Sequence, residues 1–327
     1  MPAFSEVFSI AITERIGKMK EMVQKANATY STAESLLLIA LDMDSLIPSS
    51  EPVAIKTFSE SFGASGRLDA EYYQQKYEGM ENHLNTSHTV KTLCRVHECK
   101  FAPHNDDYMY IELANIGNAG NITGCTTAPF DELPSRARRL VTEGQVIVSS
   151  IEGSLASCAL ITDEYDGAIC STGFHVVNSS MINAETLLVL FRSAPMQLLM
   201  KKRCSGTILS AISKTAFEEM PLPFIDTKLQ QQVADEVQQS FLHRRRSEQL
   251  LDTAKRAVEI AIEKGESTAL AWLEEAGTED NVVTLKSRDY YDQRFKLWQQ
   301  NQGLAARGDI DRQTLREIFD AMDDDDK

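Results

Sequence analysis

Long uncharged apolar runs are missing from this sequence of 327 residues. A membrane-spanning helix needs about 18 or more such residues in a row, and the longest apolar run, from Leu36 to Leu41, is far shorter. The first residues also lack the basic segment followed by an apolar core that is typical of a secretion signal. We therefore expect a cytoplasmic protein with no membrane segment.

Cysteine is scarce, with six in the chain, and the spacing does not fit a disulfide framework. The run CRVHEC brings Cys94, His97 and Cys99 close together, which hints at a metal site. No second pair with a zinc-type spacing follows. We expect buried or strand-lining thiols and no metal, and a standalone enzyme that uses these three residues stays an alternative.

The motifs of several enzyme classes are also absent. The sequence has no phosphate-binding loop that ends in Gly-Lys-Ser/Thr, no His-Glu-x-x-His, and no Asn/Asp-Pro-Pro-Tyr of the kind that amino-methyltransferases use. The run SSIEGSLAS is no nucleophile elbow, because no glycine stands two residues before Ser154. The glycine-rich run NIGNAGNITG fits no dinucleotide fingerprint and is more typical of a β-hairpin loop. We predict no catalytic residues in this chain.

Positive charge is in the minority, with 33 Lys and Arg against 48 Asp and Glu and a formal net charge of −15. Basic and acidic residues nearly balance between Lys91 and Lys228, so the acidic excess lies in the flanks. In that near-neutral part, the stretch SRARRLV concentrates Arg136, Arg138 and Arg139. The net charge argues against polyanion binding, but a local cluster of this kind can still contact phosphates.

Apolar residues recur at spacings of three and four along the first forty residues and again from about 227 to 276, which predicts two long helices. Between them, short apolar runs broken by Gly, Asn and Pro predict strands of an antiparallel or mixed sheet. We predict an α+β fold in which a globular mixed-sheet domain (53–226) is flanked by an N-terminal helix (1–48) and a C-terminal helix (227–277). The two helices form an antiparallel coiled-coil-like pair. Residues 278–327 are a polar acidic tail that ends in DDDDK, a sequence typical of a cleavage tag.

Three local features sharpen this prediction. A short helix is expected in GRLDAEYYQQKYEGMENHL, with Asp69 as its N-cap. A helix in NAETLLVLFRSAPMQLLMKK is expected to be interrupted at Pro195. The polar run HRRRS at 243–247 is interpreted as an exposed break in the second long helix, with a docking surface for an acidic partner as the alternative.

Three stretches follow one another in a specific order and spacing: GRLDAEYYQQKYEGM, SRARRLVTEGQVIVSSIEGSLASCALITDEYDGAICSTGFHVV and GTILSAISKTAFEEMPLPFIDTKLQQQVADEVQQSF. This series resembles the target-recognition domain of type I restriction-modification specificity subunits. The resemblance covers roughly residues 52–277. In that family a subunit usually has two recognition domains joined by two helical spacers, and each domain reads one half of a split DNA site.

The resemblance implies a non-catalytic specificity subunit that binds double-stranded DNA. Its partners would be methyltransferase (modification) subunits, which carry S-adenosylmethionine, and a restriction (motor-nuclease) subunit. No cofactor is therefore expected in this chain. Because the chain has one recognition domain, it is either the second half of a longer subunit or a half-subunit that forms a homodimer.

Two sets of residues are candidates for contact with DNA. Phosphates are contacted by basic, hydroxyl-bearing and small residues, and bases are read by long polar side chains on loops. The phosphate candidates are Arg136, Arg138, Arg139, Ser149, Ser150, Gly153, Ser154, Ser171, Thr172, Lys201, Lys202 and Arg203. The base-reading candidates are Lys100, His104, Asn105, Asn115, Asn118, Asn121 and Thr123.

Each set has an alternative explanation. The arginines could form a solvated face, and the serines and glycines could shape turns without touching DNA. The main alternative function is a coiled-coil assembly protein whose middle domain binds another protein, without DNA recognition. The acidic balance of the chain favours this alternative.

Overall fold

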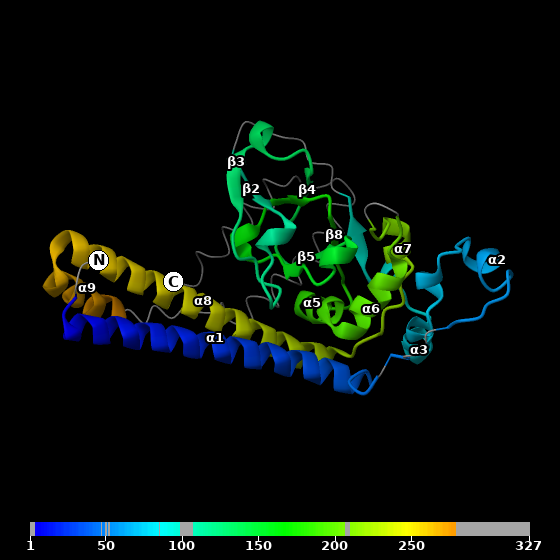
Figure 1. Ribbon diagram of the computed structural model, residues 1–327, viewed down its shortest axis with the longest axis horizontal. Helices are drawn as coiled ribbons and strands as arrows, with labels where there is room; N and C mark the ends of the chain where they lie inside the picture. The colour runs from blue at the N-terminus through cyan, green and yellow to red at the C-terminus, as the bar shows by residue number, and fades with distance from the viewer. Residues whose placement is uncertain are drawn as a thin grey trace, which may run out of the picture. The chain divides into compact units, whose positions relative to one another are not determined.

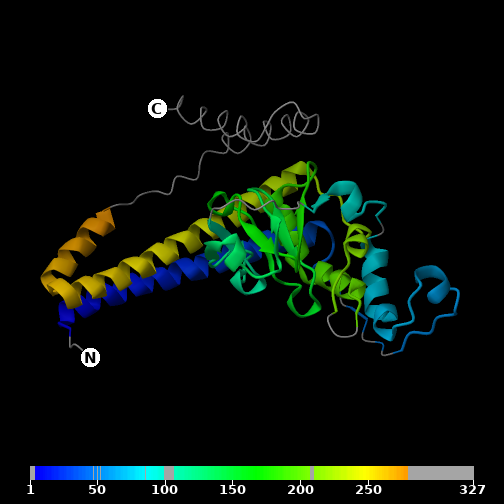
Figure 2. The ribbon, with the colours of Figure 1, turned by 90° about the horizontal axis from the view of Figure 1, so that it is seen from above.

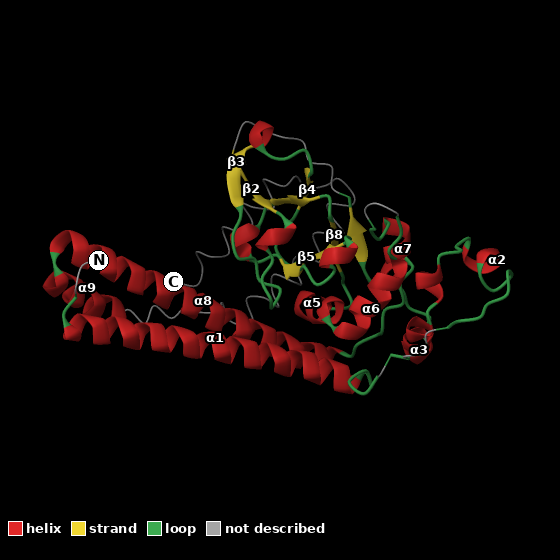
Figure 3. Cartoon of the chain, viewed as in Figure 1, coloured by secondary structure: helices red, strands yellow, loops and turns green. Residues whose placement is uncertain are grey.

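The computed structural model describes residues 4–278 apart from 47, 50, 52, 85, 99–106 and 207–209. The chain divides into two compact units, Met1–Glu266 and Ser267–Lys327. The first unit contains two long helices, two four-stranded sheets and shorter helices (Figure 3). The predicted α+β class is confirmed.

Helices α1 (Glu6–Ala40) and α8 (Thr227–Lys264) lie side by side in Figure 1 and in Figure 2. The backbone N–H of Ser5, just before α1, donates to both carboxylate oxygens of Glu266, just after α8, at 3.0 and 3.2 Å. The start of α1 therefore lies at the end of α8, and the pair is antiparallel. With a rise of about 1.5 Å per residue, α1 is about 50 Å long.

The faces that the two helices bury are apolar or small, as the periodicity predicts. Residues of this size allow two helix backbones to approach closely, and isolated helices are marginal without such packing. The buried residues are Phe8, Ala26, Tyr30, Ala33 and Leu37 of α1 and Gln230, Val233, Ala234, Val237, Ser240, Ser247, Leu250, Ala254, Ala257, Ile260 and Ala261 of α8.

The polar run HRRRS does not break α8, which continues through it. Ser247 is buried. Arg244 is half-buried and donates from Nη2 to Oδ1 of Asn27 on α1 at 2.6 Å. One turn earlier, the hydroxyl of Ser240 donates to the carbonyl oxygen of Ala26 at 2.7 Å. The interpretation of 243–247 as an exposed break is therefore wrong, because polar groups here bond across the helix pair.

A second correction concerns the end of α8. One helix to about residue 276 was expected, but α8 ends at Lys264 and a separate helix, α9 (Glu266–Thr278), follows. Gly265 has a φ of 91°, a backbone conformation that other residues rarely adopt, and it interrupts the helix. No helix in the described part of the chain is long and apolar enough to cross a membrane.

The strands form two sheets whose neighbours are mostly antiparallel. The first sheet has the order β1 (Arg95–His97), β8 (Phe174–Asn178), β5 (Val146–Ser149) and β6 (Cys158–Leu160). The second has the order β3 (Thr126–Pro129), β2 (Asp107–Ile111), β7 (Ile169–Ser171) and β4 (Ala137–Leu140), in which β2 and β7 are parallel. The predicted mixed sheet is therefore two sheets.

The two sheets are joined directly by the chain. Thr172 and Gly173 connect β7 of the second sheet to β8 of the first. Both strands are buried along their whole length, as is β5, and apolar residues predominate in all three. One hydrophobic cluster, which includes Ile111, Ile147 and Phe174, has members from both sheets.

Helices α5 (Ala184–Arg192), α6 (Ala194–Arg203) and α7 (Lys214–Glu218) connect the first sheet to the long helices. The predicted interruption at Pro195 is confirmed: α6 begins at Ala194, and a proline in the first turn sacrifices no helical hydrogen bond. The main hydrophobic cluster includes Leu37 of α1, Leu188 of α5 and Val233 of α8. The helix pair and the domain therefore share one core.

A buried amide holds the start of α8 against α5. The side chain of Gln230 accepts from the backbone N–H of Asn183 at 2.9 Å and donates to the carbonyl oxygens of Met181 and Ile225, both at 2.8 Å. Asn183 in turn caps α5, because its side chain accepts from the N–H of Thr186. A buried polar side chain with these bonds satisfied fixes the angle between the two helices.

The chain between α1 and β1 forms short helices: α2 (Phe62–Ser65), η1 (Ala70–Tyr73), α3 (Gln75–Leu84) and α4 (Val90–Leu93). Further 3-10 turns are η2 (Leu113–Asn115), η3 (Phe130–Glu132), η4 (Glu152–Ser154) and η5 (Asp163–Tyr165). Asp69 is the N-cap residue of η1, as predicted, but its side chain makes no capping hydrogen bond. Its carboxylate pairs with Arg67 at 2.5 Å, and the α-helix starts only at Gln75.

His175 of β8 links the first sheet to α7. Its ring stacks on Phe217 at 4.5 Å between centroids, and its Nε2 lies 3.1 Å from the carbonyl oxygen of Ile212, to which it donates. Its Nδ1 is buried without a partner among the described residues. Burial, helped by the nearby charge of Arg139, lowers the pKa of His175 to about 4.

We predict that the folded state loses stability between about pH 6.5 and pH 4. In this window an unfolded histidine binds a proton but buried His175 does not, so the free energy of unfolding falls by up to about 3 kcal/mol. Urea unfolding at several pH values measures this loss. In His175→Gln, whose amide can replace Nε2 but does not titrate, the decline should be shallower. Equal declines in both proteins would show that His175 does not contribute.

Candidate nucleic-acid interface

Three segments that are far apart in the sequence meet at one place in the domain. The carbonyl oxygen of Arg136, just before β4, accepts from the N–H of Thr172 at 2.9 Å. The carbonyl oxygen of the next residue, Gly173, accepts from the N–H and the hydroxyl of Ser150, at 2.8 and 2.9 Å. The arginine-rich strand, the turn at 171–173 and the turn at 149–154 are therefore adjacent. We call the exposed residues Arg136, Arg138, Gly153 and Thr172 the arginine patch.

Arg136 is held in position but stays accessible. Its side chain is 59% exposed, and it donates to the hydroxyl of Tyr110 at 3.2 Å and to Oε2 of Glu112 at 2.7 Å. These bonds, from Tyr110 first and then Glu112, raise the pKa of Arg136. Because exposed ion pairs contribute little in water, the guanidinium can exchange Glu112 for another anion.

The other two arginines of the cluster lie differently. Arg138 is exposed and its guanidinium carbon lies 5.4 Å from the centroid of the Phe130 ring. Arg139 is half-buried and donates from Nη1 to the carbonyl oxygen of Phe174, so it joins β4 to the first sheet. In this conformation Arg139 supports the domain and leaves Arg136 and Arg138 as the exposed cations of this cluster.

The hydroxyls proposed as phosphate donors are mostly occupied within the domain. Ser149, Ser150 and Ser171 are buried. The hydroxyls of Ser149 and Ser154 lie 3.1 Å apart, and that of Ser171 accepts from the N–H of Gly173 at 3.2 Å. The geometry favours the alternative in which these serines shape the two turns. A contact with DNA stays a prediction for them and would require the turns to open.

The glycine-rich run forms a small hairpin closed by a bridge between Ile116 and Ile122. Gly120 has a φ of 77°, and a side chain there would meet Leu188 of α5 at 2.6 Å, so only glycine fits this close approach. The hairpin is thus packed onto α5. We call residues 115–123 the recognition loop.

The four candidate side chains of the recognition loop differ in whether they are already hydrogen-bonded or buried within the domain. Asn115 Oδ1 accepts from the N–H of Glu112 at 2.9 Å, which links the loop through Glu112 to Arg136. Thr123 donates to the carbonyl oxygen of Asn115 at 3.0 Å, and Oδ1 of Asn121 is buried without a partner among the described residues. Asn118 is exposed, and its side chain is the most available for base reading.

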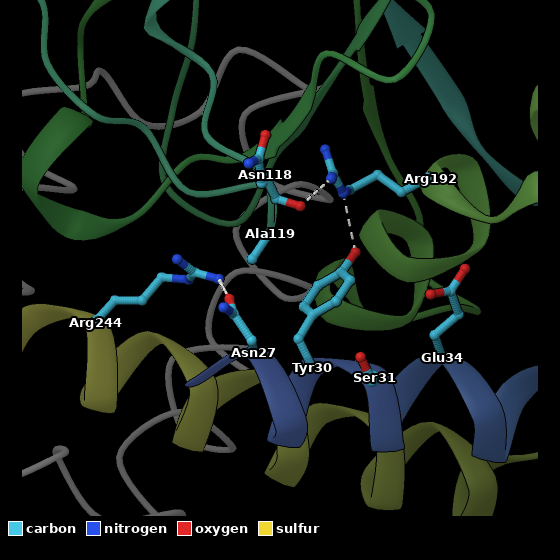
Figure 4. Close-up of a pocket in the computed structure, with 8 residues that line it drawn as sticks. All are labelled: Asn27, Tyr30, Ser31, Glu34, Asn118, Ala119, Arg192 and Arg244. Atoms are coloured by element: carbon cyan, nitrogen blue, oxygen red, sulfur yellow. Dashed lines mark hydrogen bonds between the residues drawn. The ribbon is translucent and has the colours of Figure 1, made fainter. Parts of the chain in front are cut away.

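Arg192, at the end of α5, joins the recognition loop to the helix pair, a role that the sequence analysis did not identify. It donates to the hydroxyl of Tyr30 on α1 at 3.1 Å and to the carbonyl oxygen of Asn118 (Figure 4). It also donates to the carbonyl oxygen of Ala156 at 2.6 Å. Burial raises the pKa of Tyr30 to about 12, so its hydroxyl stays protonated. Arg192 is the one arginine of a mostly apolar helix, so the sequence offered no pattern that would have identified it.

A second basic cluster, Lys201, Lys202 and Arg203 at the end of α6, mainly joins α6 to α3. Lys202 is buried and pairs with Glu81 of α3 at 2.5 Å, and Arg203 pairs with the same carboxylate at 3.0 Å. The Lys202 ammonium also lies 4.8 Å from the centroid of the Tyr72 ring. Only Lys201 of this cluster is exposed. The cluster as a whole therefore does not form a basic surface, because α3 supplies its counter-charge.

Some candidates lie outside the described residues, namely Lys100, His104 and Asn105, and so does Cys99. Nε2 of His97 lies 2.7 Å from Oδ1 of Asn178, and burial raises the pKa of Cys94 to about 12. No group of three possible metal ligands occurs within the described part of the chain.

Comparisons with known proteins return matches among solved structures. No protein-family model matches the chain, and no curated protein matches it in sequence. The HsdS subunit from Thermoanaerobacter tengcongensis is 23% identical, with a TM-score of 0.36, over 52% of this chain and 47% of that one. A second structure comes from work on the complex assembly and conformational transition of the type I R-M system. It is 23% identical, with a TM-score of 0.37, over 55% of this chain and 49% of that one. The matches thus cover about half of each of those chains.

We predict that Glu81→Gln destabilises the domain by about 2 kcal/mol, because it leaves the buried ammonium of Lys202 without its counter-charge. Urea unfolding measures the loss. The matched control is Glu21→Gln, whose partner Lys25 forms an exposed pair within one helix, and no measurable change is expected there. Equal stabilities of the Glu81→Gln variant and the wild type would show that Lys202 and Arg203 do not need this anchor.

Proposed function

We propose that this chain is a sequence-specific DNA-binding specificity subunit of the type I restriction-modification class. In this proposal the α+β domain binds the target duplex and has no chemistry of its own. The observation that carries the proposal is the arginine patch. Three segments singled out in the sequence as DNA-binding converge there, with Arg136 exposed just before β4 and Arg138 exposed on it.

Arg136 and Arg138 would contact backbone phosphates and fix the register of the domain on the duplex. Arg136 is positioned in advance by Tyr110 and Glu112, and a phosphate would replace the carboxylate as its partner. The link from Arg136 through Glu112 to Asn115 connects this phosphate contact to the recognition loop. Asn118 on that loop would read base edges in the groove.

The helix pair would serve as the scaffold for partner subunits. It is rigid because it shares one core with the domain, so a protein bound along it keeps a fixed position relative to the bound DNA. We propose methyltransferase subunits, which hold S-adenosylmethionine, and a restriction subunit as these partners, as the sequence resemblance implies. A second copy of this chain, or the remainder of a longer subunit, would supply the other half-site.

A protein-binding adaptor without DNA recognition is a second candidate, which one surface feature favours. Large apolar side chains are exposed along the segment between α1 and α3, where Ile55 is 90% and Phe58 is 68% exposed. Exposed apolar clusters often mark protein interaction sites. A specificity subunit also has protein partners, so the salt dependence of DNA binding separates the two candidates.

We predict that the chain binds duplex DNA with an affinity that falls steeply as salt concentration rises. Arg138→Ala should weaken binding to all sequences alike and should reduce the slope of log affinity against log salt by about 1, because one phosphate contact is lost. Fluorescence anisotropy across a salt series measures both. Lys20→Ala, which removes an exposed cation from α1, should leave the slope unchanged. A loss on one target alone would exclude the phosphate role, and no salt-dependent binding by the wild type would favour the adaptor.

The partner prediction is tested by co-expression with a type I methyltransferase subunit. The two should co-purify, and host DNA should gain adenine methylation at one short motif. The double variant Arg136→Ala, Arg138→Ala should still co-purify, because the helix pair is intact, but should lose the methylation. Methylation that does not depend on this chain, or the absence of any complex, would contradict the proposed role.

A further inference from the structure

An open cleft of about 350 Å³ lies where the recognition loop meets the helix pair. Its walls include Asn27, Tyr30 and Ser31 of α1, Asn118 of the loop, and the two arginines Arg192 and Arg244 (Figure 4). The cleft thus presents two guanidinium groups, although the chain has a net charge of −15. The cleft is separate from the residues of the arginine patch.

The two arginines differ in what they bind. Arg192 is occupied, since it donates to Tyr30, Ala156, Cys158 and Asn118. Arg244 donates to Asn27 alone, and its Nε is buried with no hydrogen-bond partner among the described residues. A buried N–H without an acceptor costs free energy. At this cleft, Arg244 is the side chain with such an N–H among the described residues.

The acidic groups near the cleft do not supply that acceptor. Glu34 lines the far end, on the side of Arg192 and away from Arg244 (Figure 4). Glu248, one turn along α8, forms no ion pair with Arg244 among the described residues, although its charge raises the pKa of Arg244. Burial is the largest effect and lowers the pKa of Arg244, and the nearby charge of Arg192 lowers it further.

We propose that this cleft binds a phosphate group, with Arg244 as its main ligand and Asn27 and Ser31 beside it. The guanidinium offers the N–H groups of Nη1 and Nη2 that Asn27 does not use, and Asn27 keeps an amide N–H₂ while its Oδ1 accepts from Arg244. Ser31 adds a hydroxyl on the next turn of α1. Several donors on two adjacent helices match the three or four oxygens of a phosphate better than the two of a carboxylate.

Two sources can supply such a phosphate. One is the backbone of DNA bound by the recognition loop, and this version rests on the proposed function. The other is a free phosphate compound. Both use the same chemistry at Arg244, and they differ in whether inorganic phosphate alone binds.

The experiment compares the full-length wild type with Arg244→Gln and with Arg245→Gln, which removes an equal charge from the exposed neighbouring position. The first arm follows thermal unfolding as inorganic phosphate is added at constant ionic strength. The second arm measures the salt dependence of binding to duplex DNA. Arg244→Lys, which keeps the charge but not the planar set of donors, should recover only part of each effect.

A free phosphate ligand predicts a saturable rise in melting temperature in the wild type and Arg245→Gln but not in Arg244→Gln. A DNA phosphate predicts no such rise, and a salt slope that is smaller by about 1 in Arg244→Gln alone. The inference is overturned if Arg244→Gln behaves like Arg245→Gln in both arms. If the wild type does not bind DNA, the proposed function fails, and the phosphate arm alone decides this inference.

Discussion

The antiparallel contact between α1 and α8 is the constraint on which the rest of the molecule depends. The two helices are separated in sequence by the whole α+β domain, so their pairing closes the chain on itself. Ser240 bonding to Ala26 sets their register, and Gln230 fixes α5 against the start of α8. Arg192 then extends this frame to the recognition loop, so the loop has a defined position relative to the helices.

The distribution of positive charge follows from that frame. Several cations of the domain support the fold: Arg139 joins the sheets, Arg192 joins the domain to α1, and Lys202 anchors α6 to α3. Arg136 and Arg138 remain exposed just before and on β4, a strand that is bonded to both sheets. A small number of oriented cations on a rigid surface is sufficient for phosphate contact, even in an acidic chain, because screening confines the acidic flanks to local effects.

Periodicity predicted the elements whose burial follows one simple pattern. The seam through Ala26, Tyr30 and Leu37 gave α1, and Pro195 gave the division between α5 and α6. The sequence could not show that Ser240 faces a helix, that Glu81 neutralises Lys202, or that Arg192 reaches Tyr30, because each pair is far apart in the chain. At the candidate site, three of the segments found in the sequence meet, namely the arginine cluster and the turns at 149–154 and 171–173. Burial decided which of their members remain accessible, and burial depends on the tertiary fold. In the same way, the sequence could not show which bases would be read, because this depends on which side chains reach the base edges.

The measurement that tests the central claim most directly is selection of duplexes from a randomised pool by the full-length chain at low salt. The account predicts enrichment of one short sequence motif, bound through a domain whose phosphate contacts position it for base reading. Recovery of duplexes with no common motif, or of none above background, would contradict it.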